Sequence, residues 1–258
     1  MFRKCKVLAG AFVAALGLAV PQAHAALVDR GGGMLYDTVM NITWLQDANY
    51  AKTSGYCVVP GNCFSADGEM RWTQANTWAN NLNYGGYSSG WRLARNSPVD
   101  GTPSGWNFSY SNDGSTDIGL NITSPFSELS HMYYVNLGLK GYQDADGTLR
   151  SDFGIFGDGF PGSRLQADVG LVKNLQSNYY WSGTAITNDK AWYFDAVYGL
   201  QGQTMAYSNG MFGEYYAWAV RDGDVAVVPV PGSVALLAGG LALLGVVTRR
   251  RKPSVAFI

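Results

Sequence analysis

Two apolar segments near the ends of the chain constrain its fold most. The first runs from Val7 to Val20 and has no polar face. The second runs from Gly232 to Thr248, with no polar residue between Val234 and Val247. A helix that is apolar on all sides belongs in a membrane or a large core and not on the surface of a small domain. Residues 26–226 therefore remain for a folded part, a length that suits one domain.

The first segment has the features of a secretory signal peptide over residues 1–25. Basic residues at positions 3, 4 and 6 precede it, Pro21 ends the apolar helix, and Ala23-His24-Ala25 fits the small-x-small cleavage pattern. A short helix at the start of a soluble domain is the alternative, but it would need a polar face. We expect signal peptidase to remove residues 1–25, so that the mature chain begins near Ala26 outside the cytoplasm.

The second segment predicts a transmembrane helix over residues 232–248. Seventeen residues at ~1.5 Å each give about 25 Å, slightly less than a hydrocarbon core of ~30 Å, so the bilayer must thin or the flanking side chains must snorkel. Arg249, Arg250, Arg251 and Lys252 follow directly, and such clusters stay cytoplasmic. The domain is thus expected on the outer side of the inner membrane. The alternative is a buried C-terminal helix.

The last part of the chain, residues 227–258, resembles a PEP-CTERM sorting signal. Val228-Pro229-Val230-Pro231 precedes the apolar helix, and the arginine cluster lies close to the C-terminus. The usual motif of that family is Val-Pro-Glu-Pro, so Val230 stands in place of the Glu. The resemblance implies recognition and processing by an exosortase, and a Gram-negative host that makes extracellular polysaccharide or biofilm.

The charge of the central domain argues against nucleic acid as a partner. The two ends hold seven of the 18 basic residues and no acidic ones. The remaining 11 basic and 19 acidic residues give the middle of the chain a net charge of −8. Such a surface repels phosphate backbones.

The central domain is predicted to be α+β, with two helices and an antiparallel sheet. Apolar residues recur at helical spacing from Arg71 to Leu82, and a second helix is expected to open at Ser124-Pro125 and to stop at Gly138. Aromatic-rich stretches bounded by Gly, Asn and Asp predict strands at residues 178–182, 190–196 and 214–221. The Gly- and Asp-rich stretch at residues 144–164 predicts a long loop.

Several short motifs, in their order along the chain, resemble the C-terminal domain of collagen-like bacterial adhesins. The resemblance implies a C-type-lectin-like fold. Some members of that family bind polysaccharides, and most have no assigned activity. Ala94 stands where the family usually has a proline. The motifs are Ile42-Thr43-Trp44-Leu45-Gln46-Asp47, the helix of Trp78, Gly86-Tyr87, Trp91-Arg92-Leu93, Tyr180-Trp181-Ser182-Gly183, Ala191-Trp192 and Ala217-Trp218-Ala219-Val220-Arg221. The stretch from Trp44 to Tyr50 is also similar to one in PEP-CTERM proteins with such domains.

Cys57 and Cys63 are the only cysteines expected in the mature chain, because Cys5 would leave with the signal peptide. Outside the cytoplasm two cysteines this close are expected to form a disulfide across the turn at residues 60–62. A zinc site is a weaker interpretation, because zinc needs about four ligands and His131 is the only histidine in that region. No metal site is predicted.

The sequence offers little for catalysis, and no catalytic residue is predicted. Asp144 with Asp146, or Asp152 with Asp158, could serve a glycoside hydrolase, but ordinary acidic turns are the preferred interpretation. Asp144-Ala145-Asp146-Gly147 also resembles the start of a calcium loop. The glycine comes too early for an EF-hand and no Glu closes the loop, so turns are again preferred to calcium.

Exposed aromatic rings are the remaining binding signal. Trp91 and Trp106 lie in Gly-, Ser- and Pro-rich stretches and are expected to be exposed, whereas five other tryptophans occupy apolar stripes and are expected in the core. With Asp144 and Asp146 they form the candidate ligand-binding set. The leading hypothesis is a non-enzymatic surface or matrix protein, with exopolysaccharide as the candidate ligand. The alternatives are a structural envelope protein that binds other proteins and a secreted glycoside hydrolase. The five core tryptophans are Trp44, Trp78, Trp181, Trp192 and Trp218.

Overall fold

The computed structural model describes residues 27–160, 165–205 and 213–225. The signal peptide and the sorting signal with its transmembrane helix lie outside these residues and stay predictions. Within the described parts of the chain, no helix is both long enough and apolar enough to cross a bilayer.

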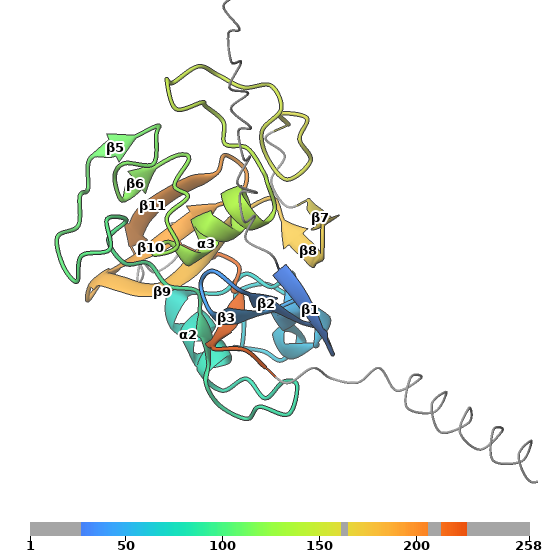
Figure 1. The fold of residues 1–258 in the computed structure, drawn as a ribbon. Coiled ribbons are helices and arrows are strands. Elements are labelled where there is room, and N and C mark those ends of the chain that lie inside the picture. Colours follow the sequence, from blue (N-terminus) through green and yellow to red (C-terminus); the bar gives the residue numbers. More distant parts are fainter. Residues whose placement is uncertain (1–26, 161–164, 206–212, 226–258) are drawn as a thin grey trace, which may run out of the picture.

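Antiparallel sheets dominate the architecture, and helices are few and short (Figure 1). The first sheet has the order β1-β2-β3-β12-β4 and the second β5-β6-β11-β10-β9, in which only β5 and β6 are parallel. β7 and β8 form a separate hairpin. The α+β prediction is therefore confirmed at the coarse level, with more strand than expected. The strands are β1 (Leu27–Gly31), β2 (Met34–Asp37), β3 (Ile42–Leu45), β4 (Trp91–Leu93), β5 (Tyr110–Ser111), β6 (Ile118–Gly119), β7 (Gln166–Val169), β8 (Val172–Gln176), β9 (Tyr179–Thr187), β10 (Lys190–Asp195), β11 (Leu200–Met205) and β12 (Ala219–Asp222).

The helices follow the sequence pattern in part. α2 (Trp72–Asn80) lies inside the predicted range and buries Ala75, Trp78 and Ala79. The remaining helices are α1 (Tyr50–Thr53), the 3-10 turn η1 (Tyr56–Val58), α3 (Glu128–His131) and the π-helical turn η2 (Met132–Asn136).

The predicted start of the second helix at Ser124-Pro125 is wrong, because α3 begins at Glu128. The Ser124 hydroxyl donates to the Val99 carbonyl at 2.8 Å and does not cap the helix. Pro125 and Phe126 instead form a turn, in which Ser127 N–H donates to the Ser124 carbonyl at 3.1 Å, and the Phe126 carbonyl accepts the Ser97 N–H at 2.8 Å. The predicted stop is confirmed, since Gly138 has a φ of 62° just after η2.

Strand β12 lies between β3 and β4 and so connects the two ends of the domain. Val220 is opposite both Trp44 of β3 and Arg92 of β4. The predicted strand at residues 214–221 is shorter than expected, because the segment before Ala219 makes only isolated bridges. The predicted strands at 178–182 and 190–196 correspond to β9 and β10.

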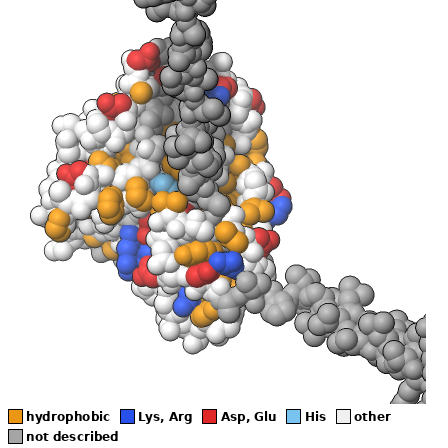
Figure 2. All heavy atoms as spheres, in the orientation of Figure 1, with side chains coloured by type: hydrophobic (Ala, Val, Ile, Leu, Met, Phe, Trp, Pro, Cys, Tyr) orange, Lys and Arg blue, Asp and Glu red, His pale blue; other side chains and the backbone are white. Residues whose placement is uncertain are grey.

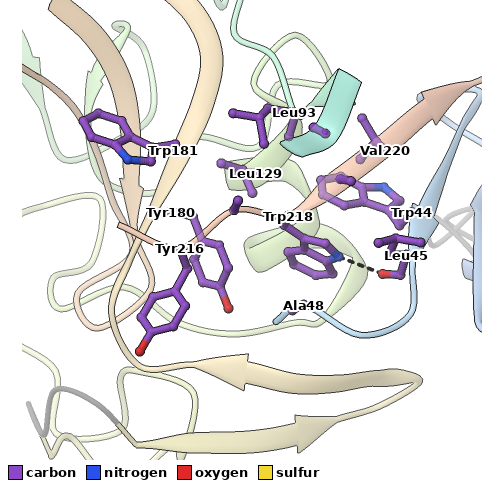
Figure 3. Packing of buried hydrophobic residues seen from close by; sticks show 14 of the residues in the cluster. Trp44, Leu45, Ala48, Leu93, Leu129, Tyr180, Trp181, Tyr216, Trp218 and Val220 are labelled. Carbon is purple, nitrogen blue, oxygen red and sulfur yellow. Dashed lines mark hydrogen bonds between the residues drawn. The ribbon is translucent and has the colours of Figure 1, made fainter. Parts of the chain in front are cut away.

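A core of tryptophan and tyrosine fills the space between the sheets (Figure 3). The five tryptophans predicted for the core are all buried, as expected. Trp218 packs on Trp44 with ring centroids 4.7 Å apart, and its indole N–H donates to the carbonyl of Leu45 at 2.7 Å. The disulfide Cys57–Cys63 is confirmed, with a Cα–Cα distance of 5.0 Å.

Replacing Trp218 by Phe is expected to lower the free energy of unfolding by about 2–3 kcal/mol. The variant loses one buried hydrogen bond and part of a large ring that fills the core. Urea denaturation monitored by circular dichroism measures the change. Val58→Ala is the control, because Val58 is 73% exposed and its loss should change stability by less than ~0.5 kcal/mol. Equal stability of the two variants would contradict the assigned role of Trp218.

Candidate ligand-binding site

Aromatic side chains line a pocket of about 590 Å³ in the described part of the chain, here called the aromatic pocket. Three parts of the chain build it: β5 with the residue after β6, the loop at residues 140–160, and the turn between β10 and β11. β6 pairs with β11, which places the first and third parts side by side (Figure 1). The lining residues are Tyr110, Leu120, Tyr142, Phe153, Gly159, Tyr198 and Leu200.

Three rings of the aromatic pocket pack on one another. Tyr142 meets Phe153 edge-on at 5.2 Å between ring centroids and Tyr198 at 5.4 Å. Phe153 and Tyr198 are stacked at 5.7 Å. Edge-to-face and offset contacts of this kind stabilise ring positions beyond simple burial. The rings are therefore held in place before any ligand arrives.

The three tyrosines of the aromatic pocket have hydroxyls available to a ligand. Among the described residues, no hydrogen bond is made by the hydroxyl of Tyr110, Tyr142 or Tyr198. None of the three is enclosed away from solvent, and Tyr110 is 56% exposed. Burial of its surroundings raises the pKa of Tyr110, so its phenol stays protonated. A phenol can both donate and accept, which suits sugar hydroxyls.

The loop predicted at residues 144–164 is described up to Phe160, where it has no helix or long strand, and residues 161–164 lie outside the described residues. The described loop, residues 140–160, is held by backbone hydrogen bonds. Arg150 N–H donates to the carbonyl of Tyr142 at 3.0 Å, and Gly154 N–H donates to Lys140 at 3.1 Å. Gly159 has a φ of 68°, and a Cβ there would lie 2.4 Å from the Ser151 carbonyl oxygen. A larger residue could not occupy this position without moving the loop.

A tight turn from Asp195 to Gly199 presents Tyr198 to the aromatic pocket. The Asp195 carboxylate accepts the Val197 N–H at 2.8 Å, and the Asp195 carbonyl accepts the Gly199 N–H at 2.8 Å. Tyr142 N–H donates to the Tyr198 carbonyl at 2.9 Å, which ties the loop to the turn. Burial raises the pKa of Asp195 to about 6, partly offset by the backbone hydrogen bonds from Val197 and Tyr198.

Two of the acidic residues considered as calcium ligands form ion pairs in the structure. Arg150 bonds both Asp144 and Asp152, and Lys140 also bonds Asp152. Asp146 accepts the Thr148 N–H at 2.9 Å, as an ordinary acidic turn does. The Arg150 guanidinium takes the place between the carboxylates that a cation would need, so these residues do not fit calcium. No cluster of three or more metal-binding side chains occurs in the described ranges.

The same contacts make the proposed carboxylate pairs poor candidates for glycoside hydrolysis. A general acid needs a raised pKa, whereas the hydrogen bond from Lys140 and the contact with Arg150 lower the pKa of Asp152. The hydrogen bond from Thr148 N–H likewise lowers the pKa of Asp146. His131 is buried, with its Nδ1 2.7 Å from the Thr123 carbonyl oxygen, and packs inside the domain.

The expected exposure of Trp91 is wrong. Trp91 is 2% exposed because it is the first residue of β4 and lies opposite Arg221 of β12. Its ring meets Tyr84 edge-on at 6.0 Å, and the Arg221 guanidinium lies 5.9 Å from it. Glycine and serine before Trp91 mark the turn that precedes the strand, and they do not place the ring at the surface. A buried ring presents no face to a sugar.

Trp106 is half-buried and does not line the aromatic pocket. It packs on the buried Trp192 with centroids 4.8 Å apart. The structure therefore does not bring together the four ligand-binding candidates Trp91, Trp106, Asp144 and Asp146. It does place the acidic loop at the aromatic pocket, through Tyr142 and Phe153.

Sequence analysis missed the tyrosines of the aromatic pocket. Tyr142 precedes the acidic stretch, Phe153 lies within it, and Tyr198 lies in an Asp-to-Gly turn between two strands. Aromatic residues in such turns are a usable signal, because loops on a rigid scaffold commonly carry binding residues.

Changing Asp195 to Asn is expected to remove a pH dependence of stability. Because the pKa of Asp195 rises from 3.8 to about 6 on folding, the folded protein binds the proton more tightly than the unfolded chain. This group therefore lowers the stability of the wild type as pH rises from about 4 to 6, by up to about 3 kcal/mol, and adds nothing further above that range. Asn keeps an oxygen for the Val197 N–H and does not ionise.

Urea titrations of both proteins between about pH 4 and 7 test this expectation. The variant should gain stability relative to the wild type as the pH rises. Parallel stability profiles would show that the Asp195 carboxyl is not shifted. Asp189→Asn, in the exposed turn between β9 and β10, is the control and should follow the wild type.

No protein-family model, curated protein or solved structure matches this chain. The function proposed below therefore depends on the geometry of the aromatic pocket and on the sequence patterns of the two ends.

Proposed function

We propose that this chain is an exported surface or extracellular-matrix protein that binds polysaccharide in the aromatic pocket. The observation that carries the proposal is a cavity of about 590 Å³ with packed rings and with phenol hydroxyls that bond no other described residue. Sugar rings present apolar C–H faces and polar hydroxyls, and amphipathic aromatic side chains match both. Pockets that are mostly apolar with a few placed polar groups are the usual form of a small-ligand site.

The fold is compatible with the proposed lectin-like domain. Antiparallel sheets with α2 and α3 beside them agree with the arrangement that the resemblance implies, and the motifs around Trp44, Trp181 and Trp218 supply its core. Function does not follow from fold, so the resemblance only adds weight to a ligand suggested by the aromatic pocket.

Export is supported by the disulfide and by the two ends of the sequence. A bond between Cys57 and Cys63 is stable in oxidising compartments and rare in the cytoplasm. We propose that signal peptidase removes residues 1–25 and that an exosortase processes the region of Pro229 and Pro231. The protein is held in the inner membrane before this step, and lies at the cell surface or outside the cell after it.

Changing Tyr198 to Ala is expected to weaken polysaccharide binding about ten-fold. The variant loses one stacking ring and one hydroxyl, together worth roughly 1–2 kcal/mol. A glycan array with the purified protein first identifies the ligand, and titration calorimetry then measures the dissociation constant. Tyr198→Phe should recover most of the stacking contribution and leave only the smaller loss from the hydroxyl.

Phe64→Ala is the matched control for an exposed ring, because Phe64 is solvent-exposed and does not line the aromatic pocket. It should bind like the wild type. Binding that Tyr198→Ala leaves unchanged would exclude the aromatic pocket as the site.

Replacing Pro229 and Pro231 by Ala is expected to leave an unprocessed protein in the inner membrane. The proposed exosortase reads the prolines ahead of the apolar segment, while that segment still anchors the chain. Cell fractionation and mass spectrometry of the C-terminus measure the result, and deletion of residues 229–258 should release the domain. Pro253→Ala, in the same tail, is the control. Normal processing of the double variant would contradict sorting by this motif.

A structural role in binding other proteins is the second candidate function. A groove of about 460 Å³ lies between the β2–β3 turn and the start of α3, where Val39 and Phe126 are exposed beside Arg95. Mixed apolar and charged surfaces with Arg and aromatic residues are common in protein interfaces. A negative glycan array together with loss of partner binding in Phe126→Ala would favour this role.

A further inference from the structure

We propose that the aromatic pocket selects uncharged polysaccharides and rejects acidic ones. This inference rests on the proposed function and names the ligand class of the same site. It follows from two features of the described residues: the lining carries no charge, and the rim, which comprises the loop at residues 140–160 and the turn of Asp113, is negatively charged.

Among the residues that the structure describes, the lining of the aromatic pocket has no charged side chain. Its seven residues are three tyrosines, a phenylalanine, two leucines and a glycine. A uronate or another acidic sugar would find no arginine or lysine there to pair with its carboxylate. A buried anion without a partner is costly, whereas an uncharged sugar can use the phenol hydroxyls.

The rim is acidic because aspartates directly adjoin the lining residues. Asp152 precedes Phe153 and Asp158 precedes Gly159, and consecutive Cα atoms lie only ~3.8 Å apart. Asp144 follows Tyr142 by two residues. Figure 2 shows acidic side chains along the upper edge of this face, where the loop at residues 140–160 lies.

A second acidic turn adjoins the same rim. The side-chain amide of Asn121 donates to the carbonyls of both Asn112 and Gln143, at 2.6 and 2.8 Å. This bridge holds the turn of Asp113 against the start of the loop. Asp113 is exposed and accepts the Ser115 N–H at 3.0 Å.

The basic residues of the rim are occupied by the aspartates. Arg150 bonds Asp144 and Asp152, and Lys140 bonds Asp152. Between Lys140 and Phe160 four aspartates therefore outnumber two basic residues, for a net charge of −2. Asp113 makes the rim more negative, and residues 26–226 as a whole, the rim included, carry a net charge of −8. An acidic polymer would have to break these ion pairs to find a cation.

This electrostatic selection should depend on ionic strength. At physiological salt the screening length is ~8 Å, so the aspartates next to the lining act on a bound carboxylate even where more distant ones are screened. At low salt the whole acidic domain contributes, and like-charge repulsion slows and weakens association.

The test compares two oligosaccharides of equal length and linkage, one of glucose and one of glucuronate, with the purified full-length chain. Calorimetry at low and at physiological ionic strength measures both dissociation constants. We expect the glucose oligomer to bind at least about ten-fold more tightly at low salt, and the ratio to fall as salt is added. Tighter binding of glucuronate, weakening with salt, would overturn the selectivity while supporting polysaccharide binding. Absence of binding by both would overturn the proposed function and this inference with it.

Charge-neutral variants provide a second, independent test. Asp146 and Asp158 are exposed and accept backbone N–H groups of Thr148 and Phe160, which Asn can also do. The double variant D146N/D158N should therefore fold normally and bind the glucose oligomer as the wild type does. Its affinity for glucuronate should rise by roughly three- to ten-fold at low salt.

Asp189→Asn is the matched control for this experiment. Asp189 is exposed and lies just beyond the opposite end of β10, six positions or ~20 Å from Asp195. It should not change the ratio of the two affinities. An unchanged ratio in D146N/D158N, measured beside this control, would contradict selection by the rim.

Discussion

Strand β12 lies between β3 and β4, and this placement makes the domain one unit. Its four residues hydrogen-bond to strands that are more than a hundred positions earlier in the sequence. Arg92 of β4 strengthens the junction, because its buried guanidinium forms a two-point contact with Glu128 of α3 and also bonds Asp222 of β12. Removing one partner of such a buried pair typically costs about 3–5 kcal/mol, so strand, helix and sheet depend on one another here. The core of Trp44 and Trp218 forms directly beneath this junction.

The aromatic pocket stands partly apart from that core. Phe153, Trp192 and Val197 are buried but lie outside the main hydrophobic cluster, as do Leu120 and Ile122. Two of them, Leu120 and Phe153, line the aromatic pocket, and Phe153 packs against both Tyr142 and Tyr198. This separation has a functional consequence: rings at the mouth of the aromatic pocket can change without disturbing the packing around Trp218. Under the proposed function, ligand specificity and fold stability would therefore be set by different groups of residues, as is common where loops on a rigid scaffold carry recognition.

The elements that sequence could predict are those governed by local pattern. The spacing of apolar residues located α2, aromatic runs located β9 and β10, and two near cysteines located the disulfide. Long-range contacts decided the rest. The Ser124-Pro125 pair is typical of a helix N-terminus, but the Ser124 hydroxyl donates to the carbonyl of Val99, 25 positions earlier. Trp91 follows glycine and serine, yet pairing with β12 buries it. The aromatic pocket is lined by residues from three distant segments, and no short sequence motif predicts that these segments lie together.

The aspartates of the acidic loop suggest metal binding or hydrolysis from the sequence, whereas in the structure they form ion pairs and turns. Asp144, Asp146 and Asp152 have the composition of a calcium loop or a hydrolase pair. Their role in the structure is instead to hold the loop. Arg150, in the same stretch, pairs with Asp144 and Asp152 and so fixes the loop that carries Tyr142 and Phe153. The carboxylates thereby hold the aromatic rings in position, and their excess over the basic residues gives the rim its charge. A loop of this kind can influence which ligand enters without any of its aspartates touching a metal or a scissile bond.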